Sequence, residues 1–454
     1  MVWRWAVAII IVAAVARVGW AAWIAHAEPG AVRAVDTPSY LGPARAMIDA
    51  GRFTLSPADP TPMFVRTPGY PAFLVPILWL TDSEWAISPI QAVISLLGVV
   101  AIVWMGWRLV GLATGLIAGV LLLLDPLQFR ASGTILTEGV ATVTMVAIVA
   151  VGVLVFAVRR PREVPTPVVL GLGALVAAAA MVRPTMWFYP VMLLTLLAAR
   201  FRRLGWRALL ARLLAFALPI VVVLGGWQIR NHNAVGSWQL SGAPGLNLYC
   251  SNAAEIEARQ AGISFEAARR QLGCPTSFDN PEGICTSTVG SSCRIPDPDA
   301  RGQGLDEWSR RGLAIMRDHP FQTARIMIEG MVRQVTGPGT DTVRGYFDLG
   351  PSVPLTAGLF LWNAALWTFA VVGAVAGFRS KYRSFWVFMV TTIGYVILVS
   401  AGDNAGARYR SPVIPLLALL AALGIRHVVG RVSRAQRPAA HVSPQQLATA
   451  GRAG

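Results

Sequence analysis

Runs of about 20 consecutive apolar residues recur along most of this 454-residue sequence, and they constrain its fold more than any other feature. A helix of that length crosses a hydrocarbon core of roughly 30 Å. Only 14% of the residues are charged, against roughly 25% in soluble domains, and 55% are hydrophobic. We therefore predict an all-α polytopic membrane protein. These features exclude an ordinary soluble protein, a disordered chain and a small disulfide-rich scaffold, and the continuous runs argue against an outer-membrane barrel.

The formal net charge of +16 has two interpretations. A basic excess can mark nucleic-acid binding. In a membrane protein it more simply reflects Lys and Arg in cytoplasmic loops. We adopt the second interpretation and predict no nucleic-acid partner. The basic clusters assigned to the cytoplasm on this basis are residues 159–162, 200–212, 379–383 and 426–437.

The basic clusters set the direction of each membrane span. About ten spans alternate across the membrane from a cytoplasmic N-terminus, each near the roughly 17–25 residues needed. The predicted spans are 5–25, 86–107, 110–125, 138–158, 165–182, 186–200, 213–230, 352–378, 384–401 and 410–427. The first is interpreted as a signal anchor rather than a cleaved signal peptide.

The apolar stretch Tyr70–Leu80 is too short to cross the membrane comfortably. Counting it as a span would also place the cluster that begins at Arg159 outside the cell. We therefore interpret it as an interfacial or re-entrant helix on the outer face.

This topology divides the chain into four parts. Residues 1–230 form a transmembrane core with a first external loop at 26–85, and residues 231–350 form an external region. Residues 351–430 are the C-terminal transmembrane helices, and 431–454 are a cytoplasmic tail that we expect to be disordered.

The external region contains all four cysteines of the chain, at positions Cys250, Cys274, Cys285 and Cys293. An oxidising exterior favours disulfides, but the three possible pairings stay open, and free thiols are the alternative. The spacing does not match a zinc site. Helical periodicity over Gly304–Val335 predicts two helices divided at His319–Pro320, because proline disfavours the helical state in the residue before it.

Ionisable and aromatic side chains at the outer ends of the spans are the candidates for chemistry. They come from distant parts of the sequence, yet the topology places all of them on the external face. A group of carboxylates and arginines at one depth of a helical bundle suits an anionic ligand together with a proton acceptor. The candidates are Asp36, Tyr40, Arg66, Tyr70, Glu138, Arg183, Arg230, Arg408 and Arg410.

Each candidate also has a purely structural interpretation. Asp36 could cap the helix that begins near Pro38, and Glu138 could cap a helix or pair with an arginine. Arg66 could extend to the membrane interface. Arg183 and Arg230 could be external anchors or ion-pair partners.

With their neighbours, these positions resemble the external loops of GT-C glycosyltransferases, in particular protein O-mannosyltransferases and lipid A aminoarabinose transferases. Asp36 with Tyr40, followed by Arg-Thr-Pro-Gly-Tyr-Pro at 66–71, resembles their first loop, and Leu136-Thr137-Glu138 resembles their second. Further similar segments lie at 181–185, 227–231, 318–320 and 407–412. The resemblance covers nearly the whole chain except the cysteine-containing insert and the tail.

The resemblance implies a sugar donor carried on polyprenyl phosphate and an external acceptor hydroxyl on a glycan, a lipid or a protein. It implies that Asp36 is the general base and that Arg66, with Arg408 or Arg410, holds the donor phosphate. The sequence departs from some relatives in having Arg where a Lys or a His-Pro-Pro occurs, and in lacking a large C-terminal soluble domain. These departures leave the acceptor and the phosphate contacts open.

The chemistry of sugar transfer gives the same residue types a role. A carboxylate accepts the acceptor proton as the C–O bond forms, and guanidinium groups stabilise the charge on the leaving phosphate. A single base opposite the phosphate predicts inversion at the sugar carbon. The first external loop has no Asp-x-Asp pair, so we expect no metal and no other cofactor.

Two other functions are compatible with a helical membrane protein. A transporter or lipid flippase tends to show inverted repeats and polar residues at mid-membrane, and no pairing of halves is visible here. A non-catalytic scaffold predicts no concentration of acids and arginines around one cavity. We therefore favour a glycosyltransferase of the cell membrane, with its site on the extracytoplasmic face.

Overall fold

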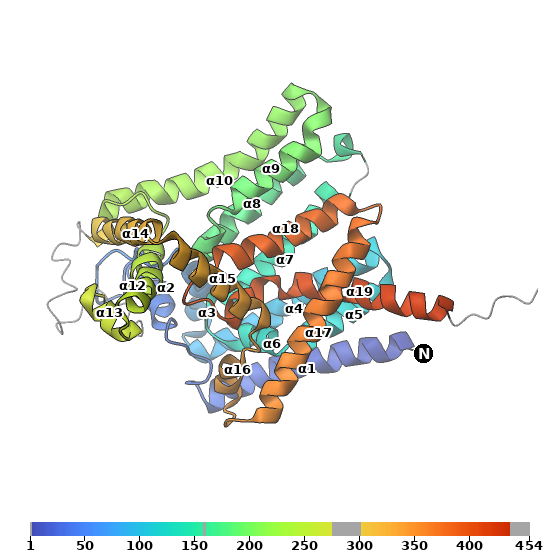
Figure 1. Ribbon diagram of the computed structural model, residues 1–454, viewed down its shortest axis with the longest axis horizontal. Coiled ribbons are helices and arrows are strands. Elements are labelled where there is room, and N and C mark those ends of the chain that lie inside the picture. Colours follow the sequence, from blue (N-terminus) through green and yellow to red (C-terminus); the bar gives the residue numbers. More distant parts are fainter. Residues whose placement is uncertain (1, 158–159, 275–300, 436–454) are drawn as a thin grey trace, which may run out of the picture.

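The computed structural model describes residues 2–157, 160–274 and 301–435, and within these ranges the protein is helical and contains no β-strand (Figure 1). Every predicted span coincides with a helix. These ten helices are α1 (Val2–Ala27), α4 (Ile87–Leu109), α5 (Leu112–Leu124), α7 (Thr137–Phe156), α8 (Thr166–Val182), α9 (Tyr189–Phe201), α10 (Trp206–Val235), α17 (Val353–Phe378), α18 (Arg383–Val399) and α19 (Ile414–Ala435).

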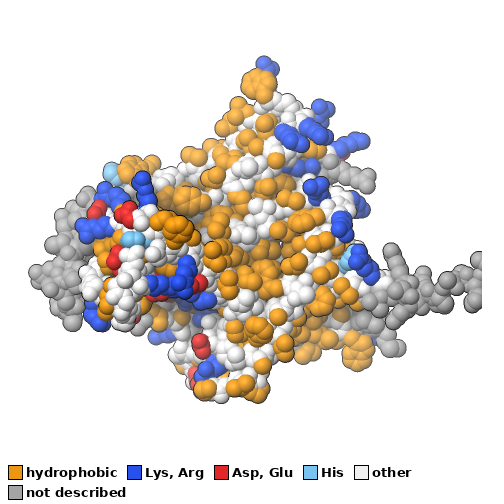
Figure 2. All heavy atoms as spheres, in the orientation of Figure 1, with side chains coloured by type: hydrophobic (Ala, Val, Ile, Leu, Met, Phe, Trp, Pro, Cys, Tyr) orange, Lys and Arg blue, Asp and Glu red, His pale blue; other side chains and the backbone are white. Residues whose placement is uncertain are grey.

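The protein is a polytopic membrane protein by the length and apolarity of these helices. Six helical segments among the described residues are long and apolar enough to cross a membrane, and α5 with α6 (Pro126–Gly133) would make a seventh. Helices α8 and α18 are apolar but shorter. The count of ten crossings therefore stays a prediction. Figure 2 shows hydrophobic side chains spread over the broad central face, while Lys and Arg gather toward the ends of the molecule.

Close helix packing holds the C-terminal half of the bundle together. A Cβ atom on Gly373 of α17 would lie 1.9 Å from the carbonyl oxygen of Leu420 in α19, so only glycine allows this approach. Small residues at such contacts let two backbones pack closely, which drives helix association in membranes. The first third of α19, from Ile414, is almost fully buried.

Helices α5 and α6 meet at a bend of 65°. The bend falls at Asp125–Pro126, where Pro126 has no N–H to continue the helix and Asp125 accepts a hydrogen bond from Gln128 N at 2.9 Å. The buried Arg17 donates to the carbonyls at the end of α5, at 3.1 and 2.7 Å. The backbone oxygens that the bend releases are therefore satisfied inside the protein.

The loop predicted to be external, residues 26–85, contains two helices, α2 (Pro38–Asp49) and α3 (Gly69–Thr81). Helix α3 matches the predicted short helix Tyr70–Leu80, and its interfacial or re-entrant orientation stays a prediction. Tyr70 and Leu74 of α3 are completely buried. Helices α2 and α3 pack against each other, so the loop forms a compact layer over the bundle.

The predicted second external region forms a helical module, with α12, α13 and α14 at the left of Figure 1 and α15 and α16 nearer its middle. Its helices are α11 (Ala243–Asn247), a π-helical turn η5 (Leu248–Ala253), α12 (Ala254–Ala261), α13 (Phe265–Gln271), α14 (Arg301–Asp318), α15 (Pro320–Thr336) and α16 (Thr340–Phe347). The predicted break at His319–Pro320 is confirmed, because α14 ends at Asp318 and α15 begins at Pro320.

A disulfide joins Cys250 in η5 to Cys274 just after α13. This settles the pairing of two cysteines, whereas Cys285 and Cys293 lie outside the described residues. The predicted tail also lies outside them from residue 436 onward, and its first residues continue α19 to Ala435.

Candidate functional site

Asp36 lies at the end of the loop that joins α1 to α2. Pro38 takes the first position of α2, and its fixed backbone angle suits a helix start, so Asp36 stays on the loop just outside the helix. Thr37 anchors this loop, because its hydroxyl donates to the carbonyl of Ile135 at 2.9 Å. The Asp36 carboxylate is therefore held over the start of α7 and remains partly accessible, with 27% of the side chain exposed.

Arg66 is the principal partner of Asp36. One of its terminal nitrogens donates to Asp36 Oδ1 at 2.6 Å, and its Nε donates to Ser39 Oγ at 2.9 Å. The same serine hydroxyl donates to the Asp36 carbonyl at 2.6 Å. The predicted encounter of Asp36 with Arg66 is thus present, with Ser39 as a third member that the sequence did not single out.

Arg408 approaches the same carboxylate from the other end of the chain. Its Nη2 lies 3.9 Å from Asp36 Oδ2 and 3.3 Å from the hydroxyl of Tyr409. Arg408 belongs to the short helical turn η7 (Ala407–Val413), which leads directly into α19. Asp36 therefore lies between two guanidinium groups from opposite ends of the sequence.

The charge of Asp36 follows from these partners. Burial alone raises the pKa of the carboxyl, but the positive charges of Arg66 and Arg408 and the Arg66 hydrogen bond outweigh it, so the net pKa lies below the ordinary value. Asp36 is consequently a carboxylate at neutral pH, as a proton acceptor must be.

Arg183 extends the basic side of the site. Its guanidinium lies over the ring of Tyr409, 5.7 Å from the ring centre, and its Nη1 is buried with no hydrogen-bond partner in the described part of the chain. Arg183 directly follows the last residue of α8. Gly69, at the start of α3, packs against the end of the same helix. A Cβ on Gly69 would lie 2.5 Å from the carbonyl oxygen of Met181, so this glycine brings the Arg66 loop and Arg183 together.

Two tyrosines lie beneath Arg66. Its guanidinium lies over the ring of Tyr40 at 4.8 Å, and Tyr40 meets Tyr70 edge to face at 5.1 Å. The Tyr70 hydroxyl donates to Gln91 Oε1 at 2.6 Å. Tyr40 is therefore buried between Arg66 and Tyr70, and Tyr70 supports it from inside the protein.

Glu138 occupies the first turn of α7 and is almost fully buried. Its Oε2 has no hydrogen-bond partner among the described residues. A buried carboxylate oxygen without a partner is costly, and the charges of Arg130 on α6 and of Arg408 interact favourably with it. The sequence analysis missed Arg130, although it lies between Asp125 and Glu138 in a segment already marked as external.

Two candidate arginines lie elsewhere. Arg230 donates to the backbone carbonyls of Met63 and Phe53, both at 2.9 Å, and packs on the ring of Trp227. Arg410 is buried and also donates to backbone carbonyls of another segment. The structure therefore brings Asp36, Arg66, Arg183 and Arg408 together, but not Arg230 and Arg410.

A small, mostly apolar pocket with a volume of about 10 Å³ lies beside Arg183 and Tyr409. Helices α7, α8 and α18 supply most of its wall, which contains Ala141, Met145, Ala179, Met186, Val396 and Val399. Thr144, Thr185, Tyr395 and Ser400 add polar groups to the lining. A pocket of this volume holds about one water molecule at most. In the described ranges, no three His, Cys, Asp or Glu side chains lie close enough to share a metal ion.

No protein-family model and no curated protein matches this sequence. Among solved structures, the chain is similar to the archaeal oligosaccharyltransferase AglB from Archaeoglobus fulgidus in complex with an inhibitory peptide and a dolichol-phosphate. The two are 12% identical over 98% of this chain and 53% of the other, with a TM-score of 0.45. The apo form of the Archaeoglobus fulgidus oligosaccharyltransferase gives 11% identity, coverage of 95% and 51%, and a TM-score of 0.48.

A second similar protein is ArnT from Cupriavidus metallidurans bound to undecaprenyl phosphate, at 14% identity, coverage of 97% and 80%, and a TM-score of 0.40. The chain thus spans about half the length of the oligosaccharyltransferase and most of the length of ArnT. All three TM-scores lie below 0.5.

Proposed function

We propose that this protein is a membrane glycosyltransferase. It moves a sugar from a polyprenyl-phosphate donor to an acceptor hydroxyl on the extracytoplasmic face. The observation that carries the proposal is the Asp36 carboxylate held between Arg66 and Arg408, with the charge of Arg183 also acting on it. The AglB and ArnT structures contain dolichol-phosphate and undecaprenyl phosphate, which belong to the donor class proposed here.

The donor phosphate would lie among the arginines, and its lipid chain would have to widen the small pocket beside Arg183. The Arg183 nitrogen without a partner is a vacant donor for a phosphate oxygen. Arg66 and Arg408 both contact the Asp36 carboxylate, and either guanidinium could release it and bind a phosphate oxygen instead. Because buried cations without an anion are costly, binding of the phosphate relieves the charge imbalance of the site.

Asp36 then acts as the general base. It takes the proton of the acceptor hydroxyl as that oxygen forms a bond to the sugar carbon, and the bond from this carbon to the phosphate oxygen breaks. The electron pair of the broken bond stays on the polyprenyl phosphate, whose charge the arginines stabilise. A single displacement of this kind inverts the configuration at the sugar carbon.

Binding of the phosphate also tunes the base. In the empty site the two arginines lower the pKa of Asp36. A phosphate that shares these arginines offsets part of their positive charge, so the pKa of Asp36 rises toward its ordinary value and its basicity increases. Glu138 contributes as a second buried acid that orients Arg130 and Arg408 rather than as a second base.

The test is a transfer assay with the full-length protein in lipid nanodiscs. Wild type is incubated with a panel of radiolabelled polyprenyl-phosphate sugars and with envelope extract as the acceptor. Expected is label transfer with at least one donor, and its loss in Asp36→Asn. The matched control is Asp49→Asn, since Asp49 is an exposed aspartate at the end of α2. Donors that are bound or moved across the bilayer without any covalent transfer would refute the proposal and favour a flippase.

A further inference from the structure

The segment that carries Arg408 is attached on its N-terminal side to α15 of the external module. Arg333 of α15 donates from Nη2 to the carbonyls of Gly402 at 2.9 Å and Asp403 at 2.6 Å. Its Nε donates to the carbonyl of Ala405 at 3.1 Å. One guanidinium thus binds three backbone oxygens of a loop that has no regular structure of its own.

The attachment is reciprocal on the C-terminal side of Arg408. Arg410 donates from Nη1 to the carbonyls of Gln334 at 2.6 Å and Gly337 at 2.7 Å, which lie at the end of α15. Carbonyls at a helix C-terminus lack partners within the helix and carry partial negative charge, so a buried arginine satisfies them well. Arg408 and Tyr409 therefore lie between two points at which the chain is fastened to the same helix.

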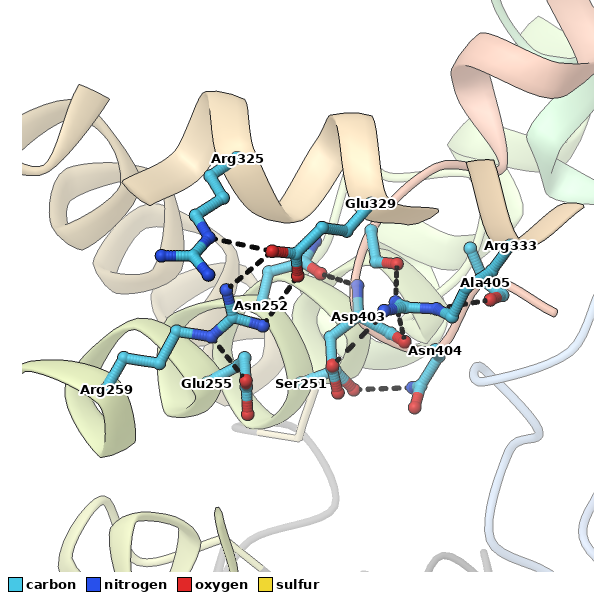
Figure 3. A network of polar contacts seen from close by, with 11 residues as sticks. Ser251, Asn252, Glu255, Arg259, Arg325, Glu329, Arg333, Asp403, Asn404 and Ala405 are labelled. Atoms are coloured by element: carbon cyan, nitrogen blue, oxygen red, sulfur yellow. Dashed lines mark hydrogen bonds and ion pairs between the residues drawn. The ribbon is translucent and has the colours of Figure 1, made fainter. Parts of the chain in front are cut away.

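A third contact comes from the turn η5, which contains the disulfide residue Cys250. Asn252 Oδ1 accepts a hydrogen bond from Asp403 N at 2.9 Å, and Asn404 Nδ2 donates to Ser251 Oγ at 2.6 Å. Figure 3 shows these side chains converging on the 402–405 loop from two sides.

The two elements that bind the loop, α15 and η5, are also joined to each other, because α12, which follows η5, forms an ion pair with α15. Arg259 of α12 pairs with Glu329 of α15 at 2.8 Å and with Glu255 at 2.6 Å, as Figure 3 also shows. The 402–405 loop is consequently held by a module made only of external helices. Within the described residues, the side-chain hydrogen bonds to this loop come from α15 and η5. Beyond Arg408 the membrane bundle also holds the segment, because the carbonyl of Ser411 accepts hydrogen bonds from Gln128 and Thr142.

We propose that Arg333 is a positioning residue that fixes Arg408 at Asp36, and that the external module thereby sets the geometry of the acid site. This inference rests on the proposed function, because it assigns Arg408 a task in transfer. Arg333 itself touches neither Asp36 nor the apolar pocket. It acts through the loop, which it binds at Gly402, six residues before Arg408, and at Ala405, three residues before Arg408.

The structural arm of the test measures hydrogen–deuterium exchange of residues 402–413 in nanodiscs. We expect Arg333→Ala to speed exchange in this segment at least tenfold and Arg333→Lys, which keeps the charge but not the fork, to give a smaller increase. The matched control is Arg325→Ala, because Arg325 lies on the same helix, is 72% exposed and, among the described residues, pairs with Glu329 alone. Exchange in Arg333→Ala equal to that of wild type overturns the proposal whether or not transfer is detected.

The functional arm is a double-mutant cycle in the transfer assay. We expect kcat/KM to fall at least tenfold in Arg333→Ala and less than twofold in Arg325→Ala. In an Arg408→Ala background, Arg333→Ala should cost less than a further twofold, because its only route to the site is already removed. The acid limb of kcat/KM should move to higher pH in both Arg333→Ala and Arg408→Ala, since Asp36 then keeps Arg66, Arg183 and Tyr40 but loses one cation.

Fully additive losses in the cycle, or an unmoved acid limb, overturn the positioning role. Absence of transfer by wild type refutes the proposed function, while the exchange experiment still decides whether Arg333 fixes the segment. Arg333→Lys keeps the test decisive if Arg333→Ala does not fold.

Discussion

Replacement of Asp36 by asparagine removes one negative charge and almost no volume. The amide oxygen of asparagine can still accept the hydrogen bond that Arg66 now gives to Asp36 Oδ1 at 2.6 Å. Ser39 keeps its contact with the backbone at position 36. The loop and the basic side of the site should therefore keep their shape, and the change is confined to the proton acceptor.

The magnitude follows from what is lost. A positioned general base contributes roughly 100- to 10,000-fold, which is about 3–5 kcal/mol of transition-state stabilisation. By contrast, the partly exposed ion pair of Asp36 with Arg66 contributes about 1 kcal/mol or less to folding. We therefore expect Asp36→Asn to lose at least 100-fold in kcat while its unfolding temperature changes by only a few degrees.

The assay compares wild type, Asp36→Asn and Asp49→Asn in nanodiscs under single-turnover conditions, with donor binding measured separately. Donor affinity should be unchanged or stronger in Asp36→Asn, because the phosphate no longer competes with a carboxylate for Arg66. Transfer by Asp36→Asn within threefold of wild type, at equal protein folding, would remove Asp36 from the proton transfer and refute the reasoning.

Three further predictions concern charge and packing. Since the cations hold the pKa of Asp36 below its ordinary value, kcat/KM should be at its maximum at neutral pH and fall only as the pH drops through that low pKa. Arg408→Ala removes one of these cations, so the fall in kcat/KM should move to higher pH. Cys250→Ser opens a disulfide with a sequence separation of 24, which should lower the stability of the external module by roughly 3–4 kcal/mol, measured as protease resistance with and without reductant. Gly373→Ala should destabilise the bundle by roughly 1–3 kcal/mol in thermal unfolding, because its methyl group meets a carbonyl of α19 at 1.9 Å. The control is Gly358→Ala on the same helix, whose methyl group meets no atom within 4 Å and which should be neutral or mildly stabilising.

The membrane helices could be predicted from the sequence because their lengths are set by the bilayer and not by neighbours. The break at His319–Pro320 was equally accessible, since proline acts on the backbone locally. The convergence of Asp36, Arg66 and Arg408 could be predicted only as far as a shared face of the membrane, through the topology.

The positions that sequence analysis did not resolve depend on tertiary contacts. Arg230 and Arg410 look like ligand-binding arginines in the sequence, but both give their hydrogen bonds to backbone carbonyls of distant segments. Which carbonyls lack partners depends on how helix ends meet in space. Arg130 was missed for the converse reason, because only the fold shows that its guanidinium lies near the buried Glu138.

The tight contact between α17 and α19 has a consequence for motion at the site. Helix α19 begins directly after the turn that bears Arg408, and its first third, from Ile414, is buried in the bundle. Interlocked backbones of this kind are stiff, so α19 gives the segment that bears Arg408 a rigid end on one side, while Arg333 fixes it on the other. Any adjustment to an arriving substrate must then be made by the opposite wall, which is the Asp36 loop with its two short helices.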